Sequence, residues 1–292
     1  MTSIRAAFQG EKGAFSEDAA RRFFGAAADP VPCRDFDQLF AAVVRGEADA
    51  AIVPIENTLA GAIIKNYDLL LEHDVTIVGE VVIRVKHNLI GIPGAKLADV
   101  RRVFSLPVAL AQCERFLQEH PEIEAVASYD TAGSVKMIME AGRADETAIA
   151  GESAARAWGA EILVAGIESN PQNFTRFMVV TRGDRPPPPG PFAQSGERKT
   201  SIVFAINHRP GGLHQALAAF AEQQVNLTKI ESRPIPGRPW EYFFYVDFLG
   251  DPVDAPVARA LDHLRQSAES LRVLGCYPRA EMPAPATIGE TQ

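Results

Sequence analysis

Short polar segments that follow apolar runs carry the side chains best able to act on a small molecule. Residues 54–58 place a carboxylate, a carboxamide and a hydroxyl directly after a buried strand, where open α/β sheets bind ligands. Residues 130–134 supply an acid and two hydroxyls, and residues 173–177 add a guanidinium that can clamp a carboxylate with two hydrogen bonds. The candidate ligand-binding residues of these segments are Glu56, Asn57, Thr58, Thr131, Gly133, Ser134, Asn173, Arg176 and Phe177.

A further segment, residues 8–16, ends a strand, turns through two glycines and begins a helix. The first amides of a helix have no partner within it, so they can bind an anion beside Ser16. The segment lacks the GxGxxG spacing, which argues against a bound dinucleotide.

Each segment also has a purely structural interpretation. Residues 8–16 are then an ordinary strand-to-helix turn, Asn57 or Thr58 caps the following helix, and Asp130 is a helix N-cap. By the same reasoning, Arg176 is an exposed arginine on a strand.

The histidines give little indication of chemistry. His87 is either a hydrogen-bond donor in a pocket or a structural residue, and the structural role is the simpler one. The other histidines show no metal-ligand spacing, so we predict no metal site.

The elements around these segments alternate between short apolar strands and amphipathic helices. This alternation predicts an α/β domain of two lobes with a cleft between them, a periplasmic-binding-protein-like architecture. Strand-to-helix corners from the two lobes can then point into one cleft. The predicted strands cover residues 5–8, 50–55, 75–92, 103–104, 125–129, 148–150 and 174–181, and the predicted helices cover 15–24, 36–43, 63–71, 108–118 and 132–140.

A proline-rich segment divides the chain. Residues 183–198 include four consecutive prolines, which can continue neither a helix nor a central strand, so we predict a linker there. Beyond it, strands and helices follow in the order β-α-β-β-α-β, which predicts a ferredoxin-like domain with a sheet edge open to a second copy. The predicted division is 1–182 for the two-lobed domain, 183–198 for the linker, 199–280 for the small domain and 281–292 for a disordered tail.

Composition excludes several other classes of protein. The net charge is -8 and no run of Lys or Arg is long enough to follow a phosphate backbone, so nucleic acid is not expected as a partner. No stretch approaches the roughly 20 apolar residues of a membrane helix, and no apolar signal core follows Met1. The three cysteines include no CxxC pair and are expected to be reduced thiols. We therefore expect a cytoplasmic protein.

In order and spacing, these segments resemble the prephenate dehydratase family over nearly the whole chain, from Phe8 to about Tyr277. The strongest pieces are Pro-Ile-Glu-Asn at 54–57, Asp-Thr-Ala-Gly-Ser at 130–134 and Thr-Arg-Phe at 175–177. The C-terminal part resembles an ACT domain with its Glu-Ser-Arg-Pro signature. Gly212 stands where the family has alanine, and Thr58 stands where it has serine. No chorismate mutase segment precedes Phe8, so the resemblance is to the monofunctional form.

This resemblance implies the loss of carbon dioxide and water from prephenate, giving phenylpyruvate for phenylalanine synthesis. No cofactor is implied, because the electrons move within the substrate. The resemblance assigns Thr175 to the leaving hydroxyl, and because the pKa of threonine is far too high for an ordinary acid, we expect positioning and charge stabilisation. The residues expected to hold the two carboxylates are Arg176, Asn57, Thr58, Thr131 and Ser134.

The resemblance also implies feedback by phenylalanine bound between paired ACT domains, in a homodimer or homotetramer. Two alternatives remain open: arogenate, the aminated analogue, as the substrate, and a non-enzymatic amino-acid sensor or solute-binding protein. The expected effector-binding residues are Gly212, Leu213, Asn226, Leu227, Thr228, Glu231, Ser232, Arg233 and Pro234.

Overall fold

The computed structural model describes residues 3–183 and 196–283. The chain divides into two compact units, and the division does not follow the sequence order. Unit 1 contains Met1–His73 and Val81–Arg182, whereas unit 2 contains Gly183–Ala280 together with the short segment Asp74–Glu80. The predicted linker lies largely outside the described residues, as does most of the predicted C-terminal tail.

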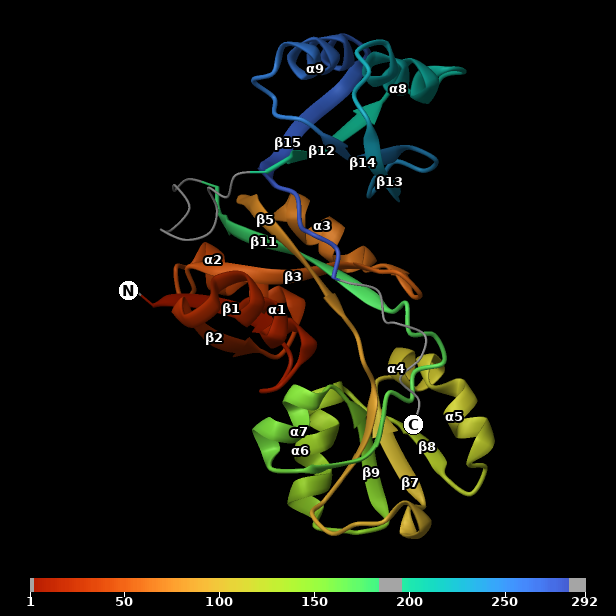
Figure 1. The fold of residues 1–292 in the computed structure, drawn as a ribbon. Coiled ribbons are helices and arrows are strands. Elements are labelled where there is room, and N and C mark those ends of the chain that lie inside the picture. The colour runs from red at the N-terminus through yellow and green to blue at the C-terminus, as the bar shows by residue number, and fades with distance from the viewer. Residues whose placement is uncertain (1–2, 184–195, 284–292) are drawn as a thin grey trace. The chain divides into compact units, whose positions relative to one another are not determined.

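The first lobe of unit 1 is built on a sheet of order β2-β1-β3-β11-β5, with β4 beside β3 (Figure 1). Its helices form because apolar residues recur at helical spacing; in α2, Asp35 caps the first turn by accepting the Gln38 N–H at 2.9 Å. The elements are β1 (Ile4–Gln9), α1 (Phe15–Phe24), β2 (Ala28–Cys33), α2 (Phe36–Val44), β3 (Ala50–Asn57), β4 (Gly61–Ala62), α3 (Ile64–Glu72), β5 (Val75–Arg84) and β11 (Phe174–Arg182).

The second lobe of unit 1 has a sheet of order β10-β6-β9-β7-β8. Two of its pairings, β7 with β8 and β7 with β9, are parallel, and α6 packs over β9 through an apolar core that includes Val135 and Ile138. The elements are β6 (Asn88–Gly91), β7 (Arg102–Ser105), α4 (Pro107–Gln112), α5 (Glu114–Glu119), β8 (Glu124–Ala127), α6 (Thr131–Ala141), β9 (Glu146–Ala150), α7 (Glu152–Trp158) and β10 (Glu161–Ala165).

A glycine turn of the first lobe makes close contact with the second. Gly13 has a φ of +89°, and a Cβ at this position would lie 2.5 Å from the Ala154 Cα in α7. Only glycine allows this approach of the two backbones. The two-glycine segment therefore serves packing between the lobes as well as starting α1.

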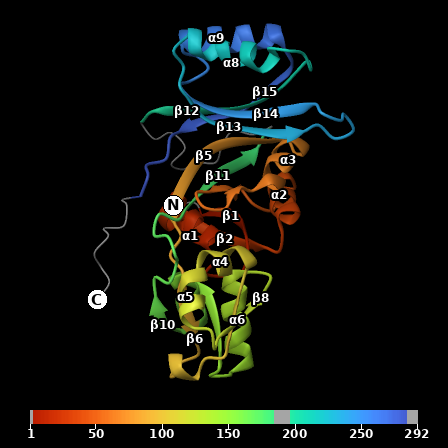
Figure 2. The same ribbon diagram turned by 90° about the vertical axis from the view of Figure 1, so that its right-hand side faces the viewer.

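Unit 2 contains a four-stranded sheet of order β13-β14-β12-β15, covered on one face by helices α8 and α9 (Figure 2). The strand order is that of the ferredoxin-like fold, and Phe204, Phe220 and Phe248 are fully buried in its core. The elements are β12 (Arg198–Ile206), α8 (Gly212–Glu222), β13 (Leu227–Pro234), β14 (Tyr242–Leu249), α9 (Ala255–Ser267) and β15 (Ala268–Pro278).

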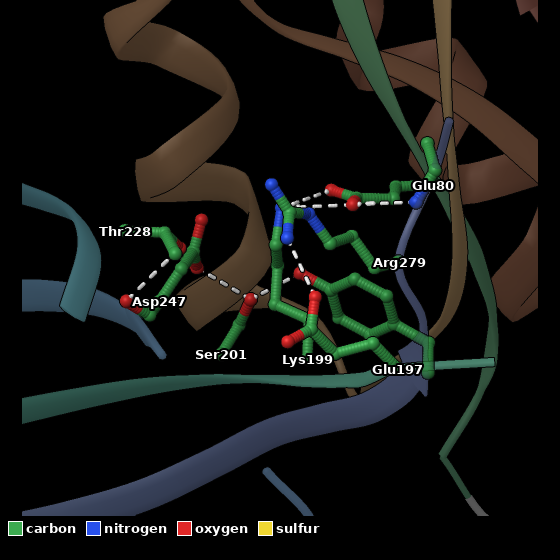
Figure 3. A network of polar contacts seen from close by, with 9 residues as sticks. Glu80, Glu197, Lys199, Ser201, Thr228, Asp247 and Arg279 are labelled. Atoms are coloured by element: carbon green, nitrogen blue, oxygen red, sulfur yellow. Dashed lines mark hydrogen bonds and ion pairs between the residues drawn. The ribbon is translucent and has the colours of Figure 1, made fainter. Parts of the chain in front are cut away.

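Unit 2 also contains a network of buried polar side chains (Figure 3). The Lys199 Nζ lies 2.8 and 3.0 Å from the two carboxylate oxygens of Glu80, which comes from the short segment that joins unit 2. Nearby, the Ser201 hydroxyl lies 2.5 Å from Asp247 Oδ1 and 2.6 Å from the Tyr277 hydroxyl. All five side chains belong to residues less than a tenth exposed, so their charges and hydroxyls satisfy one another.

The predicted fold class, two-lobed α/β with a ferredoxin-like domain, is confirmed, and the differences are local. The helix predicted over 108–118 is two short helices separated at Cys113. Strands β2 and β10 and helix α7 were not predicted. The extended run predicted over 75–92 is two strands, β5 and β6, which belong to different sheets.

Candidate active site

A cavity of about 370 Å³ is lined by residues of both lobes of unit 1. One wall is apolar and includes Phe15, Leu106 and Val108. The polar side chains that line the cavity are Gln9, Ser16, Asn57, His87, Gln112, Asp130, Thr131 and Thr175. Four of these, Ser16, Asn57, Thr131 and Thr175, are residues that the sequence predicts for ligand binding or catalysis.

Strand pairing brings Thr175 and Asn57 together, although they are 118 positions apart. In the antiparallel pair of β3 and β11, Thr175 is directly opposite Asn57, and directly opposite side chains lie on the same face. The Asn57 Nδ2 lies 3.0 Å from the Thr175 hydroxyl oxygen and 2.7 Å from Asn173 Oδ1. Because the amide is the donor, the hydroxyl of Thr175 accepts this bond and keeps its own proton free.

Gln112, at the end of α4, continues this network from the second lobe. Its Nε2 donates to Asn57 Oδ1 at 3.2 Å, and its Oε1 accepts from Asn173 Nδ2 at 2.8 Å. Asn57 Oδ1 also accepts the backbone N–H groups of Leu59 and Ala60 at 3.0 and 2.9 Å. The orientation of the three amides is therefore fixed by complementary donors and acceptors.

Two helix N-termini meet the cavity from opposite lobes. Ser16 lies in the first turn of α1, and Thr131 is the first residue of α6. Amides at these positions have no acceptor within their helices, and the helix dipole favours an anion there. Among the described residues that line the cavity, none is lysine or arginine. Any anion bound here would therefore depend on helix amides and neutral side chains.

Asp130 is the one acidic side chain in the described wall of the cavity. It caps α6, accepting the Gly133 N–H at 2.6 Å. Burial raises the pKa of Asp130 above its ordinary value, and the Gly133 hydrogen bond opposes that shift.

Seven residues of the predicted substrate site do not line this cavity. Glu56 and Arg176 are directly opposite each other in the strand pair, one position from Asn57 and Thr175, so their side chains lie on the other face of the sheet. The Thr58 hydroxyl bonds to the Gln172 carbonyl and the Phe174 N–H.

The remaining residues of the predicted set are buried inside the lobes. The Ser134 hydroxyl donates to the Asp130 carbonyl at 2.7 Å, and a Cβ on Gly133 would lie 2.5 Å from the Tyr129 ring. Phe177 is in the core. Asn173 is fully buried behind the cavity and acts through Asn57 and Gln112.

The predicted effector residues lie in two places in a single chain. Gly212 and Leu213, at the start of α8, line a second cavity of about 410 Å³ together with His208, Trp240 and Tyr242. The other seven lie in or next to β13, the edge strand of the sheet, and do not line that cavity. A Cβ on Gly212 would lie 3.2 Å from the Asn207 carbonyl oxygen, so an alanine would fit there only tightly.

The polar residues of the cavity to which the sequence assigns no place in the site are Gln9, His87, Gln112 and Asp130. Gln112 falls within a predicted helix and belongs to no recognised motif, and its partners are 55 and 61 positions away. His87 follows the long strand β5, and the structure places it in the cavity wall, the less simple of the two roles that the sequence leaves open. The folded arrangement is needed to identify Gln112.

The described residues show neither a metal-binding cluster nor a helix suited to cross a membrane. Within residues 3–183 and 196–283 there is no group of three or more His, Cys, Asp and Glu side chains that could hold a metal ion. None of the helices in those ranges has the length and apolar character needed to cross a membrane.

Comparison with known proteins gives consistent matches along the chain. The prephenate dehydratase family pattern matches residues 6–185, and the ACT domain pattern matches residues 200–265. The sequence is 44% identical over 284 residues to an arogenate dehydratase/prephenate dehydratase 2 of Arabidopsis thaliana, covering 94% of this chain and 73% of that protein. It is 40% identical to a bifunctional N-acyl-homoserine lactone acylase/prephenate dehydratase of Komagataeibacter europaeus, covering 93% of this chain and 95% of that one.

Among solved structures, a prephenate dehydratase from Arthrobacter aurescens in complex with L-Phe superimposes with a TM-score of 0.84. The two sequences are 34% identical, and the match covers 94% of this chain and 90% of the other.

Proposed function

The chain belongs to the prephenate dehydratase family, and on that premise we propose that it removes carbon dioxide and water from prephenate to form phenylpyruvate in phenylalanine biosynthesis. The observation that carries this proposal is the Thr175 hydroxyl, which lines the cavity and accepts a hydrogen bond from Asn57 at 3.0 Å. Its proton is thereby available to a leaving group.

The reaction needs no redox partner. The electron pair of the bond between the ring and the departing carboxylate moves into the ring, and the hydroxyl on the opposite ring carbon leaves. Aromatisation drives the step, so the protein has only to position the substrate and stabilise the developing hydroxide. Thr175 donates to that oxygen, while Asn57 stabilises the threonine oxygen as its proton is shared.

Prephenate has two carboxylates that must be bound, and the described wall of the cavity has no cationic side chain to bind them. The first amides of α1 and α6, with the hydroxyls of Ser16 and Thr131, supply such groups from opposite lobes. Arg176, which the resemblance assigns to a carboxylate, lies on the other face of its strand, so we assign carboxylate binding first to the helix N-termini.

The deciding experiment is turnover of prephenate and of arogenate by the full chain, together with Thr175→Val and Thr175→Ser. We expect prephenate turnover, a loss of about 10³-fold in kcat for the valine variant, and partial retention for the serine variant, which keeps the hydroxyl. Equal kcat values for wild type and Thr175→Val would contradict the role of Thr175. Turnover of arogenate alone would move the assignment to arogenate dehydratase, and turnover of neither would favour a sensor.

Regulation follows from the ACT domain, and we propose phenylalanine as the inhibitory effector. In one chain the start of α8 and the β13 residues do not share a cavity, so a complete effector site requires a second copy paired at the β13 edge. The exposed Asn226 tests this assignment: Asn226→Ala should weaken inhibition by phenylalanine while leaving the uninhibited rate unchanged. Gln223→Ala, at the end of α8, is the matched surface control.

We further propose that the protein is a cytoplasmic homo-oligomer. Light scattering after size exclusion should give the mass of a dimer or tetramer, and a monomer at micromolar concentration would contradict the paired effector site. Fractionation of cells that express the chain tests its location.

A second candidate activity is suggested by the Komagataeibacter relative, whose name includes N-acyl-homoserine lactone acylase. The apolar wall formed by Leu106, Val108 and Ile63 is suited to an acyl chain. Release of homoserine lactone from an N-acyl-homoserine lactone would demonstrate this activity. Its loss or retention in Thr175→Val would then tell whether both reactions use the same hydroxyl.

A further inference from the structure

His87 contributes a buried imidazole to the wall of the cavity, and only 2% of this residue is exposed. Its backbone is held on both sides: the N–H donates to Glu168 Oε2 at 3.0 Å, and the carbonyl accepts the Ile167 N–H at 2.9 Å. The ring lies edge-on to Phe15, with 5.7 Å between the ring centres. The position of the imidazole is therefore well determined.

The direction of its one side-chain hydrogen bond can be derived from its neighbours. The His87 Nε2 lies 2.9 Å from Gln112 Oε1, and that oxygen already accepts from Asn173 while the Gln112 amide nitrogen donates to Asn57. A carboxamide oxygen has no proton to donate, so the His87 Nε2 must carry the proton. Burial lowers the pKa of His87, which keeps the ring neutral. Nδ1 is then a bare acceptor, and it has no partner among the described residues.

One continuous path of side-chain hydrogen bonds therefore leads from this ring to Thr175, and along it each group donates to the next. The Nε2–H of His87 donates to Gln112, Gln112 donates to Asn57, and Asn57 donates to Thr175. The chain ends on a hydroxyl whose proton remains free. If Gln112 turned over, its amide nitrogen would face the donor groups of His87 and Asn173, and the donation to Asn57 would be lost.

We propose that His87 is a positioning residue for this reaction, which fixes the Gln112 carboxamide and through it directs the Thr175 hydroxyl proton toward the substrate. The kinetic consequence of this inference rests on the proposed function, whereas the hydrogen-bond geometry does not depend on it. His87 acts through Gln112 and Asn57. Its effect is partial because Asn57 Oδ1 retains the N–H groups of Leu59 and Ala60.

A matched pair of variants tests the proposal. In His87→Gln the side-chain amide reaches the position of the imidazole Nε2 and can still donate, whereas the shorter His87→Asn places its amide near Nδ1. We expect kcat for prephenate to fall about 10- to 100-fold in His87→Asn with KM changed by less than about threefold, and to stay within about fivefold of wild type in His87→Gln. Equal kcat values for wild type and His87→Asn, or an equal loss in both variants, would overturn the proposal.

A second measurement needs no turnover. In protein labelled with 15N-histidine, the His87 resonances should identify a protonated Nε2 and an unprotonated Nδ1 in the wild type, with assignment from their absence in His87→Gln. A ring protonated at Nδ1 alone would overturn the proposal even if the enzyme is fully active. If neither prephenate nor arogenate is converted, the proposed function fails, and the tautomer still decides whether the hydrogen-bond chain is correct.

Discussion

Two buried polar networks, one in each unit, differ in the kind of group they contain. The network of unit 1 consists of neutral groups, the amides of Asn57, Gln112 and Asn173 and the hydroxyl of Thr175, and it borders a cavity. The network of unit 2 contains the charges of Lys199 and Glu80, and in it every carboxylate oxygen of Glu80 has a donor (Figure 3). Asn57, Asn173 and Thr175 are less than a tenth exposed, as are Lys199 and Glu80, whereas Gln112 is partly exposed.

The difference between the two networks shows two roles that buried polar groups can have. Neutral amides can be oriented so that a donor remains free at the end of the chain, which leaves that donor available to a substrate. In a buried ion pair each charge must have its partners, since an unpaired charge in the interior costs several kcal/mol. The first arrangement suits reactivity, and the second holds the segment Asp74–Glu80 in unit 2.

The largest effect should come from reversing a donor in the neutral network. Asn57→Asp keeps the shape of the side chain and replaces the donating Nδ2 with an acceptor facing Thr175. We expect kcat to fall about 10²- to 10³-fold, the usual loss when one such donor is removed. Asn170→Asp, on the surface loop before β11, is the control. Retention of wild-type kcat would mean that the donation from Asn57 is not used.

Breaking the charged network should instead affect folding. Lys199→Met removes the lysine cation from the buried Glu80 carboxylate, and we expect the free energy of unfolding to fall by about 3–5 kcal/mol. The double variant Glu80→Met with Lys199→Met should recover most of that loss. Urea unfolding measures both, and a single variant as stable as wild type would show that the pair is not buried in solution.

A smaller effect follows from the neutral state of His87. Its pKa in the folded chain is below the ordinary 6.5, chiefly because of burial, so the unfolded chain binds more protons below pH 6.5. Stability should therefore fall as the pH falls through that range. Glu168 opposes the shift, and Arg84 in turn pairs with Glu168.

His87→Gln removes this contribution. The difference in unfolding free energy between pH 7.5 and pH 5.5, from urea titrations at each pH, should therefore be smaller in His87→Gln than in wild type. An unchanged difference would point to another titrating group.

The smallest effect concerns the cysteines, which belong to neither network. Burial raises the pKa of Cys33 to about 11 and that of Cys113 to about 12. Little thiolate is then present at pH 8, so iodoacetamide should modify these two thiols slowly in the folded protein and rapidly in urea. Mass spectrometry of tryptic peptides distinguishes the sites, and fast labelling of Cys113 in the native protein would contradict its burial.

Much of the fold could be predicted because local patterns determine it. Helix α1 begins and ends where the apolar spacing predicts. Helix α2 begins at Phe36, as predicted, and Asp35 caps it. Strand β2 was not predicted because it contains Pro30 and Pro32. These prolines are tolerated there because β2 is the edge strand of its sheet. The break at Cys113 also escaped, because its backbone leaves the helical region within an otherwise helical pattern.

The site was only half predictable, for a geometric reason. Asn57 could be chosen from its residue type and Thr175 from the family resemblance, whereas the exclusion of Glu56 and Arg176 from the cavity depends on the pairing register of β3 with β11. A shift of one residue would exchange the two pairs between the faces of the sheet. Gln112 acquires its role from partners 25 to 61 positions away, which no local pattern records.

The segment Asp74–Glu80 has a consequence for the modularity of the chain. A cut at the proline-rich segment follows the boundary between the two domains in the sequence. The first fragment would nevertheless keep Val75, Ile77 and Glu80 and would lose the residues of unit 2 that contact them. The contact between the segment and β15 is close, because a Cβ on Gly275 would lie 2.0 Å from the Ile77 carbonyl oxygen. The regulatory domain is thus not a detachable appendage: recombination at residue 183 would yield two incomplete halves, and any exchange of this domain between relatives must carry the segment 74–80 with it.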